Sequence, residues 1–283
     1  MMKKFMALGL AVVLAAAALT GCGNSAAKKT VKVIDVNLTD EEYAFGVDKT
    51  QPELLDSVNA FIKEIKDNGT FDEICNHYFG DGTPVAVTSA ALDDSKDQLL
   101  VATNAAFEPF EYMQGESYYG IDMEIAAALA QYLGNELVIQ NMDFDAVCLS
   151  VGQQKCDIAM AGLTVREDRK EYVNFSDSYY SASQKLIVLS DDTEFDSCKT
   201  ADDVAALLAA KDASVKVGVQ TGTTGQLYVE GDAEWGFPGL TAEGVGYKNG
   251  SLAVQDLLNG NIQYVIIDSA PAICITEAIN KMQ

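Results

Sequence analysis

Three loops in this sequence place polar residues directly after a short apolar run, where they could bind the charged ends of a small molecule. The first loop covers residues 161–169 and ends in Arg169. A guanidinium can bind a carboxylate through two parallel hydrogen bonds, which a lysine ammonium cannot reproduce, and Thr164 can add a hydroxyl and a backbone amide. The competing interpretation is a solvated ion pair on a surface helix, because acidic residues flank Arg169 in the sequence.

The second loop, residues 218–225, is rich in glycine and threonine and follows an apolar run. Backbone amides at the start of a helix attract anions. This loop lacks the lysine of a phosphate-binding P-loop and the glycine spacing of a dinucleotide site, so phosphate is not the favoured anion. The competing interpretation is an ordinary glycine-rich turn.

The third loop, residues 265–271, places Asp268 at the end of an apolar strand. Burying a carboxylate is costly unless a cation meets it, and the ammonium of a ligand would serve. Asp268 can also begin the next helix as its N-cap, and the two uses are compatible.

Two aromatic residues complete the candidate site. Phe107 follows a predicted strand and Phe144 begins a predicted helix. Such rings can flank the aliphatic part of a ligand. For each ring taken alone, packing in the core is the competing interpretation.

The elements that must position these loops alternate between strand-like and helical patterns, which predicts α/β architecture with mostly parallel sheets. A first series predicts strands at residues 99–103, 137–142, 157–161 and 185–189, with helices between them. A second series follows an acidic loop at residues 191–196 and predicts helices at 201–211 and 270–281, strands at 215–220 and 263–267, and a helix ending at Asn259. Thr200 with Asp203 predicts a capping box, and Ser251 is the predicted cap of the helix that ends at Asn259.

The N-terminal residues indicate export from the cytoplasm. Two lysines precede an uncharged apolar stretch, residues 5–19, which is shorter than a membrane-crossing helix requires. Leu-Thr-Gly stands directly before Cys22 and resembles the lipobox of bacterial lipoproteins. We therefore expect a lipoprotein signal peptide over residues 1–21, lipidation of Cys22, and a small polar tether over residues 22–30.

Charge and size narrow the function further. Without the signal peptide the chain has 17 basic and 42 acidic residues, a net charge of −25. Nucleic acid is therefore a poor partner, as is an anionic membrane surface, apart from the predicted lipid anchor. Roughly 260 remaining residues exceed one comfortable core and predict two domains.

The cysteine and histidine content argues against a metal site. Five cysteines follow Cys22, an odd number without a Cys-x-x-Cys motif, and His77 is the only histidine. Cys148 and Cys156 could form a disulfide, but buried free thiols are an equal alternative. We predict no metal, no cofactor and no catalytic residue.

Several motifs together resemble the polar amino-acid family of bacterial extracellular solute-binding proteins, family 3. The resemblance covers nearly all of residues 99–283, and its motifs stand in the family's order. They are Thr103-Asn104-Ala105-Ala106-Phe107-Glu108-Pro109-Phe110-Glu111-Tyr112, Gly120-Ile121-Asp122-Met123-Glu124-Ile125, residues 161–169, Asn174-Phe175-Ser176-Asp177-Ser178-Tyr179-Tyr180, and residues 265–268.

The resemblance implies a two-lobed, periplasmic-binding-protein-like (type II) fold whose lobes close over an amino acid. It implies that Arg169 holds the α-carboxylate, with Thr164 and the amides of Thr223 or Thr224, and that Asp268 and the Gly162 carbonyl hold the α-ammonium. Phe107 and Phe144 would flank the ligand side chain, with Asn104 and Gln220 near its end. The implied partner is the permease of an ABC importer, and we expect a monomer.

The order of the chain departs from the family. Residues 31–80 resemble the family's closing portion, which here comes first, while the sequence stops at Gln283, where that portion would normally follow. We interpret this as a circular permutation; the alternative is an N-terminal extension on a truncated protein. Residues 43–186 are then lobe one, with 81–97 as the linker joining the ancestral termini, and residues 31–38 plus 190–283 are lobe two. Hinge crossings are expected near residues 39–42 and 185–189.

Two further functions stay open. A sensing module for a receptor would share the same features, and a few relatives of this fold act as dehydratases or lyases. The enzyme is disfavoured because His77 lies outside the predicted site and because no second carboxylate besides Asp268 is recognised there. Relatives that bind lysine or arginine tend to have an acid where this chain has Asn104, so we expect an uncharged polar ligand such as glutamine or cystine.

Overall fold

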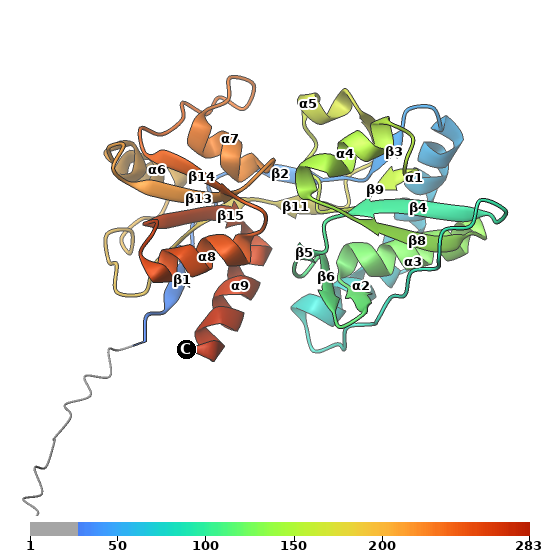
Figure 1. Cartoon of the computed structure of the whole chain (residues 1–283), viewed down its shortest axis with the longest axis horizontal. Helices are drawn as coiled ribbons and strands as arrows, with labels where there is room; N and C mark the ends of the chain where they lie inside the picture. The colour runs from blue at the N-terminus through green and yellow to red at the C-terminus, as the bar shows by residue number, and fades with distance from the viewer. Residues whose placement is uncertain (1–27) are drawn as a thin grey trace, which may run out of the picture.

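The structure, a computed structural model, describes residues 28–283. The predicted signal peptide, Cys22 and most of the predicted tether lie outside the described residues. Two α/β lobes lie side by side and are connected by two strands that cross between them (Figure 1). No helix within residues 28–283 has the length and apolar character that crossing a bilayer requires.

Lobe one is built on a five-stranded sheet in the order β10-β3-β9-β4-β8. A small three-stranded sheet, β5-β6-β7, lies beside it. The strands of lobe one are β3 (Gly46–Asp48), β4 (Gln98–Thr103), β5 (Ala106–Phe107), β6 (Glu111–Gln114), β7 (Ser117–Tyr119), β8 (Glu136–Asn141), β9 (Ile158–Ala159) and β10 (Val173–Phe175). Its helices are α1 (Pro52–Asp67), α2 (Thr70–Phe79), α3 (Ile121–Leu133), α4 (Phe144–Gly152) and α5 (Glu167–Lys170).

Lobe two is built on a second five-stranded sheet, in the order β1-β12-β15-β13-β14. Its strands are β1 (Val31–Val33), β12 (Gln184–Leu189), β13 (Lys216–Gln220), β14 (Glu243–Tyr247) and β15 (Tyr264–Asp268). Its helices are α6 (Ala201–Ala209), α7 (Thr224–Glu230), α8 (Gly250–Asn259) and α9 (Ser269–Met282).

Each large sheet is parallel in one half and antiparallel in the other. In lobe one, β4 runs parallel to β8 and β9, whereas β3 runs antiparallel to β9 and β10. In lobe two, β13 runs parallel to β14 and β15, whereas β12 runs antiparallel to β15 and β1. The prediction of mostly parallel sheets therefore holds for only half of the strand pairs, because strands next to the crossings re-enter a sheet in the opposite direction.

The first fifty described residues contribute to both lobes. Strand β1 forms the edge of the sheet in lobe two, whereas β3 lies inside the sheet in lobe one. Helix α1 begins with Pro52, which suits the first turn of a helix because its missing N–H has no partner there in any case. The buried face of α1 consists of Val58, Phe61, Ile62 and Ile65, at the spacing of an amphipathic helix.

The two crossings form a small sheet of their own, in which β2 (Glu41–Tyr43) pairs antiparallel with β11 (Tyr180–Ala182). The first crossing agrees with the expected position near residues 39–42. The second crossing was placed too late, because residues 184–189 form β12, an interior strand of lobe two. Five of these six residues are buried, as expected for a strand that pairs on both sides.

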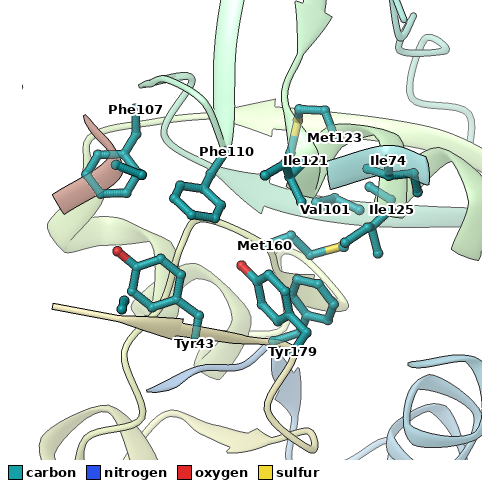
Figure 2. Packing of buried hydrophobic residues seen from close by; sticks show 14 of the residues in the cluster. Tyr43, Ile74, Val101, Phe107, Phe110, Ile121, Met123, Ile125, Met160 and Tyr179 are labelled. Carbon is teal, nitrogen blue, oxygen red and sulfur yellow. The ribbon is translucent and has the colours of Figure 1, made fainter. Parts of the chain in front are cut away.

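Aromatic packing ties the hinge to the core of lobe one. Tyr43 and Phe110 pack edge to face with ring centroids 5.2 Å apart (Figure 2). Phe45 stacks on Tyr179 with centroids 4.4 Å apart. Tyr43, Phe45 and Phe110 are each at most 1% exposed. The hinge strand β2 is therefore held by tightly packed side chains and not by its short ladder alone.

Of the two predicted helix caps, one is confirmed and one is wrong. The capping box of Thr200 and Asp203 is present at the start of α6. The cap of α8 was assigned to the wrong residue, since the side chain of Asn249 accepts the hydrogen bond from the Leu252 amide. Ser251 lies inside the first turn of α8, past the position where a cap can act. Cys148 and Cys156 are both buried free thiols, and no disulfide joins any two of the described cysteines.

Candidate functional site

The three loops predicted to bind a ligand meet between the lobes. The loop after β9 belongs to lobe one, and the loops after β13 and β15 belong to lobe two. In each case the loop leaves the carboxyl end of a strand, which is where α/β sheets bind ligands. The guanidinium groups of Arg166 and Arg169 both donate to the carbonyl of Gly222 across the cleft, at 3.2 and 3.1 Å.

Arg169 is a buried cation at this junction. Its side chain is 6% exposed, donates to the Thr164 carbonyl at 2.7 Å, and lies 5.2 Å above the ring of Phe144. Burial lowers the pKa of Arg169, and the charge of Arg166 acts in the same direction. The competing interpretation, a solvated ion pair, does not describe Arg169; an ion pair is formed by Arg166, whose buried guanidinium contacts the exposed carboxylate of Asp168 at 2.6 Å.

Thr164 lies next to Arg169 and is 3% exposed. Its hydroxyl donates to the carboxylate of Glu41 at 2.7 Å and accepts a longer hydrogen bond from Thr224 at 3.4 Å. A hydroxyl has a single proton to donate. In this arrangement the Thr164 hydroxyl therefore contacts the hinge strand, and it could donate to a ligand only by leaving Glu41.

Asp268 ends β15 and is 4% exposed. It occupies the N-cap position of α9, but its side chain makes no capping hydrogen bond and instead accepts one from the Tyr43 hydroxyl at 2.5 Å. Burial and the charge of Glu41 together raise the pKa of Asp268 to about 7, against the opposing effect of the hydrogen bond from Tyr43. Near neutral pH this carboxyl therefore needs a cation to be held fully ionised.

Two more carboxyl groups lie near this site, contrary to the expectation that Asp268 was alone. Glu41, on β2, is 1% exposed, and Glu111, on β6, is fully buried. Neither carboxylate oxygen of Glu111 has a hydrogen-bond partner among residues 28–283. Burial raises the pKa of Glu111 well above its usual value, with the charges of Asp122 and Asp268 adding to the effect. The lack of a second carboxylate is thus no longer an argument against an enzyme.

Asp122 connects the predicted residue Gly162 to the core. Its carboxylate accepts hydrogen bonds from the Gly162 amide at 2.8 Å and from the Tyr179 hydroxyl at 2.6 Å. Gly162 has φ +54°, and a Cβ atom there would lie 2.9 Å from the ring of Phe107. A side chain at this position would therefore be strained and would clash with a predicted ligand-binding ring.

The two predicted aromatics differ in their surroundings. Phe107 is 5% exposed and stacks on Phe110 with centroids 6.0 Å apart, so packing in the core accounts for much of its surface. Phe144 begins α4, is only partly buried, and has Arg169 above its ring.

Asn104 and Gln220 meet at the other end of the site. The Gln220 amide donates to the Asn104 side-chain oxygen at 3.2 Å across the cleft, and the Asn104 amide donates to the Met142 carbonyl at 2.7 Å. The side-chain oxygen of Gln220 is buried and has no partner among residues 28–283. This end can therefore accept a hydrogen bond from a donor group.

The remaining predicted residues lie at the start of α7. Thr223 is the N-cap residue and Thr224 the first residue of the helix. The Thr223 hydroxyl donates to the Gln220 carbonyl at 2.8 Å, so this hydroxyl is occupied within its own loop.

Small cavities flank the site. One of about 180 Å³ is lined by Phe144, Arg166, Arg169 and Gly222 among others, and one of about 310 Å³ by Asn104, Asp143 and Lys248 among others. At the second cavity, the ammonium of Lys248 forms an ion pair with Asp143 across the cleft at 3.0 Å. The lobes are thus in contact on both sides of the site.

Sequence reasoning missed Glu41, Glu111 and Asp122 as site residues. Asp122 and Glu111 stand inside motifs that were quoted only as part of a resemblance. Glu41 could have been found from its spacing to Tyr43, because residues two apart on a strand point to the same face of the sheet. Within residues 28–283 no group of His, Cys, Asp and Glu side chains has an arrangement that could hold a metal ion.

Comparison with known proteins gives a consistent result. The family described as bacterial extracellular solute-binding proteins, family 3, matches residues 99–265. The arginine-binding extracellular protein ArtP of Bacillus subtilis (strain 168) is 33% identical over 38% of this chain and 43% of its own length. A probable histidine-binding protein of Neisseria gonorrhoeae is 28% identical over 60% of this chain and 58% of its own length. The chain thus spans about half of the length of these relatives.

Solved structures agree in fold. Holo ArgBP from T. maritima superposes with a TM-score of 0.55 at 33% identity, covering 67% of this chain and 78% of that chain. The ancestral amino acid-binding protein AncCDT-1, described as a precursor of cyclohexadienyl dehydratase, gives a TM-score of 0.55 at 30% identity, covering 65% and 75% of the two chains.

Proposed function

The chain belongs to the bacterial extracellular solute-binding proteins, family 3, and we propose that it captures a small L-amino acid between its lobes and delivers it to an ABC importer. One observation carries the proposal: a buried arginine of lobe one and a buried aspartate of lobe two, Arg169 and Asp268, both connect to the hinge. Arg169 donates to the carbonyl of Thr164, which pairs with Tyr43, and Asp268 accepts a hydrogen bond from Tyr43. Opposite charges placed this way suit the carboxylate and ammonium groups of an amino acid.

The ligand would be oriented by both lobes. Arg169 would bind its α-carboxylate together with the amides of Thr223 or Thr224 at the start of α7, while Thr164 would contribute its backbone. Asp268 and the Gly162 carbonyl would bind the α-ammonium. The rings of Phe107 and Phe144 would flank the side chain, and Asn104 with Gln220 would contact its end.

Capture would proceed by closure of the hinge. The ligand contacts residues of both lobes only when they approach, so its binding free energy shifts the population toward the closed state. Contacts already present between the lobes support this, among them the pairs Gln220 with Asn104 and Lys248 with Asp143. The closed form would be what the importer recognises.

An uncharged polar side chain is our first candidate for the ligand, with glutamine and cystine as examples. Support comes from the two neutral amides at this end of the site and from the side-chain oxygen of Gln220. This oxygen has no partner within residues 28–283 and suits a donor such as an amide NH₂. A solved ancestral arginine-binding protein bound to glutamine is 32% identical to this chain. A basic amino acid is the second candidate, because similar proteins are named for arginine or histidine and because three acids surround the cleft.

We further propose that the chain is circularly permuted. Segment 31–80 precedes the family match and yet supplies strands to both large sheets. The side chain of Asn280, near the end of α9, hydrogen-bonds both the amide and the carbonyl of Val31, at 3.0 and 2.8 Å. Lobe one would then comprise residues 43 to about 182 with 81–97 as a linker, and lobe two residues 31–38 with the rest of the chain.

The protein would act outside the cytoplasm, held at the membrane through a lipid on Cys22 after removal of residues 1–21. A monomer suffices for this role. Two alternatives remain: a sensing role would use the same closed form, and an enzymatic role has support because AncCDT-1, which is 30% identical to this chain, is described as a precursor of a dehydratase.

The function is tested by a thermal-shift screen of the protein against the twenty amino acids and cystine. A ligand at one hundred times its Kd stabilises by about 2.7 kcal/mol. We expect one or a few L-amino acids to stabilise the wild type and Lys170→Ala, a change at an exposed position beside Arg169, but not Arg169→Ala. A folded wild type that responds to no amino acid would refute the proposal. Dehydratase activity is tested by incubating the protein with the amino acid that binds and measuring whether that amino acid is consumed.

A further inference from the structure

We propose that Glu41, on the hinge strand β2, forms with Asp268 a carboxyl pair that binds the cationic group of the ligand. This inference rests on the proposed function and adds a residue to the site. It also places part of ligand recognition on the hinge itself, in addition to the two lobes.

The position of Glu41 is the first argument. One carboxylate oxygen accepts hydrogen bonds from Thr39 at 2.6 Å and from the Gln184 amide at 2.9 Å, and the other accepts from the Thr164 hydroxyl at 2.7 Å. Gln184 belongs to lobe two and Thr164 to lobe one. The carboxylate therefore lies between the lobes at the point where they pivot.

Proximity to Asp268 is the second argument. Gln184, which donates to Glu41, is the direct partner of Asp268 in the pairing of β12 with β15. Tyr43, two residues from Glu41 on the same strand, donates to Asp268. Charges on Glu41 and Asp268 both raise the pKa of the Tyr43 hydroxyl. The two carboxyl groups thus share the same small volume.

An imbalance of charge is the third argument. The charge of Glu41 raises the pKa of Asp268, so two ionised carboxylates repel each other, and a cationic group of a ligand would relieve this repulsion. A carboxylate can accept about four hydrogen bonds, and Glu41 accepts three from the protein, which leaves room for a donor from a ligand. The titratable groups that interact with the pair are Tyr43 on β2, Glu111 on β6 and the cation Arg169 on α5.

A purely structural role for Glu41 would also explain its three hydrogen bonds. The experiment must therefore separate a structural role from binding of the cationic group of the ligand. A structural role predicts that neutralising Glu41 weakens binding equally at every pH. The carboxyl pair predicts a change in the pH profile, because the charge of Glu41 opposes the ionisation of Asp268.

The test measures the affinities of L-glutamine and L-arginine by calorimetry between pH 5.5 and 8.5. The variants are Glu41→Gln and, as a control, Glu42→Gln, which changes the exposed neighbour on the same strand. In the wild type and in Glu42→Gln, affinity should rise up to about tenfold per pH unit below the pKa of Asp268. In Glu41→Gln the affinity at pH 7.5 should fall, and the rise should move to lower pH. An unchanged pH profile in Glu41→Gln would overturn the carboxyl pair.

A second measurement does not depend on any ligand. The titration of the Asp268 carboxyl is followed by NMR in the ligand-free protein, and Glu41→Gln should lower its pKa. An unchanged titration overturns the pair. If Glu41→Gln lowers the pKa but the wild type binds none of the twenty amino acids or cystine, the proposed function fails together with the ligand role of Glu41, while the pair itself stands.

Discussion

The hydroxyl of Tyr43 donates a hydrogen bond of 2.5 Å to the carboxylate of Asp268. Tyr43 belongs to a hinge strand and Asp268 to the last strand of lobe two. A predicted ligand contact is thereby coupled to the element about which the lobes pivot. Since the ring of Tyr43 is also packed against Phe110 of lobe one (Figure 2), the orientation of Asp268 depends on both lobes.

Removing only the Tyr43 hydroxyl should therefore weaken ligand binding. Tyr43→Phe retains the buried ring and deletes one hydrogen bond to a charged group, a loss of about 1.5–3 kcal/mol at most. Because that hydrogen bond lowers the pKa of Asp268, the variant should need a higher pH to bind with full affinity. Calorimetric titration of the ligand found by the screen measures both effects. Tyr118→Phe, a partly buried tyrosine in β7, is the control, and equal affinity in wild type and Tyr43→Phe would contradict the coupling.

The stability of the ligand-free protein should fall as pH rises from about 4 to 7. Burial raises the pKa of Asp268 and of Asp122 to about 7 each. Over this interval the folded state binds more protons than the unfolded state, so raising the pH favours unfolding. One such group changes the free energy of unfolding by up to about 1.4 kcal/mol per pH unit.

Asp268→Asn removes one of these groups and should flatten that dependence. The variant should be more stable than wild type at pH 7.5 by an amount that shrinks toward pH 4, although it should bind ligand more weakly. Urea unfolding at pH 4.5, 6 and 7.5 measures the difference. A wild type whose stability rises throughout this range would contradict the assignment of buried, proton-binding carboxyls.

The sequence predicted much of this fold because its signals were local. The capping residues Thr200 and Asp203 and the amphipathic face of α1 follow from side-chain chemistry within one or two turns. The predicted residues Arg169, Asp268, Asn104 and Gln220 all lie at or after the carboxyl end of a strand, where such sheets bind ligands, and Asn104 contacts Gln220 across the lobes; their role in binding stays a prediction. What sequence could not predict was long-range: which donors hydrogen-bond to Glu41, which carboxylate has no partner in the described part of the chain, and where the second crossing ends. Those features depend on contacts between residues more than a hundred positions apart.

The ion pair of Lys248 with Asp143 should favour the closed form slightly. Both side chains are exposed, at 74% and 60%, so the pair is screened by salt and should contribute less than about 1 kcal/mol. Lys248→Gln should weaken ligand binding by up to about fivefold in low salt and by less in 0.5 M salt. Lys96→Gln breaks a comparable pair with Glu136 inside lobe one and should leave affinity unchanged. Equal losses in the two variants would show that Lys248 has no special role in closure.

The bond between Asn280 and Val31 gives a direct test of how the N-terminal strand is held. The side chain of Asn280 satisfies both backbone groups of Val31, and Val31 is 2% exposed. Asn280→Ala leaves a buried amide and carbonyl without this partner, so unfolding should become easier by about 1–3 kcal/mol. Urea denaturation measures the loss, with Lys281→Ala, an exposed change on the same helix, as the control.

The same contact bears on the proposed permutation. If the segment of residues 28–80 is moved to follow residue 283, the rearranged chain should fold and bind the same amino acid with an affinity within about threefold, because the new peptide bond joins ends that Asn280 and Val31 already hold together. In that rearranged chain, Asn280→Ala should lower the free energy of unfolding by less than it does in the present chain, because a covalent connection replaces part of the role of the hydrogen bonds. A rearranged chain that fails to fold, while the present chain folds under the same conditions, would refute the permutation.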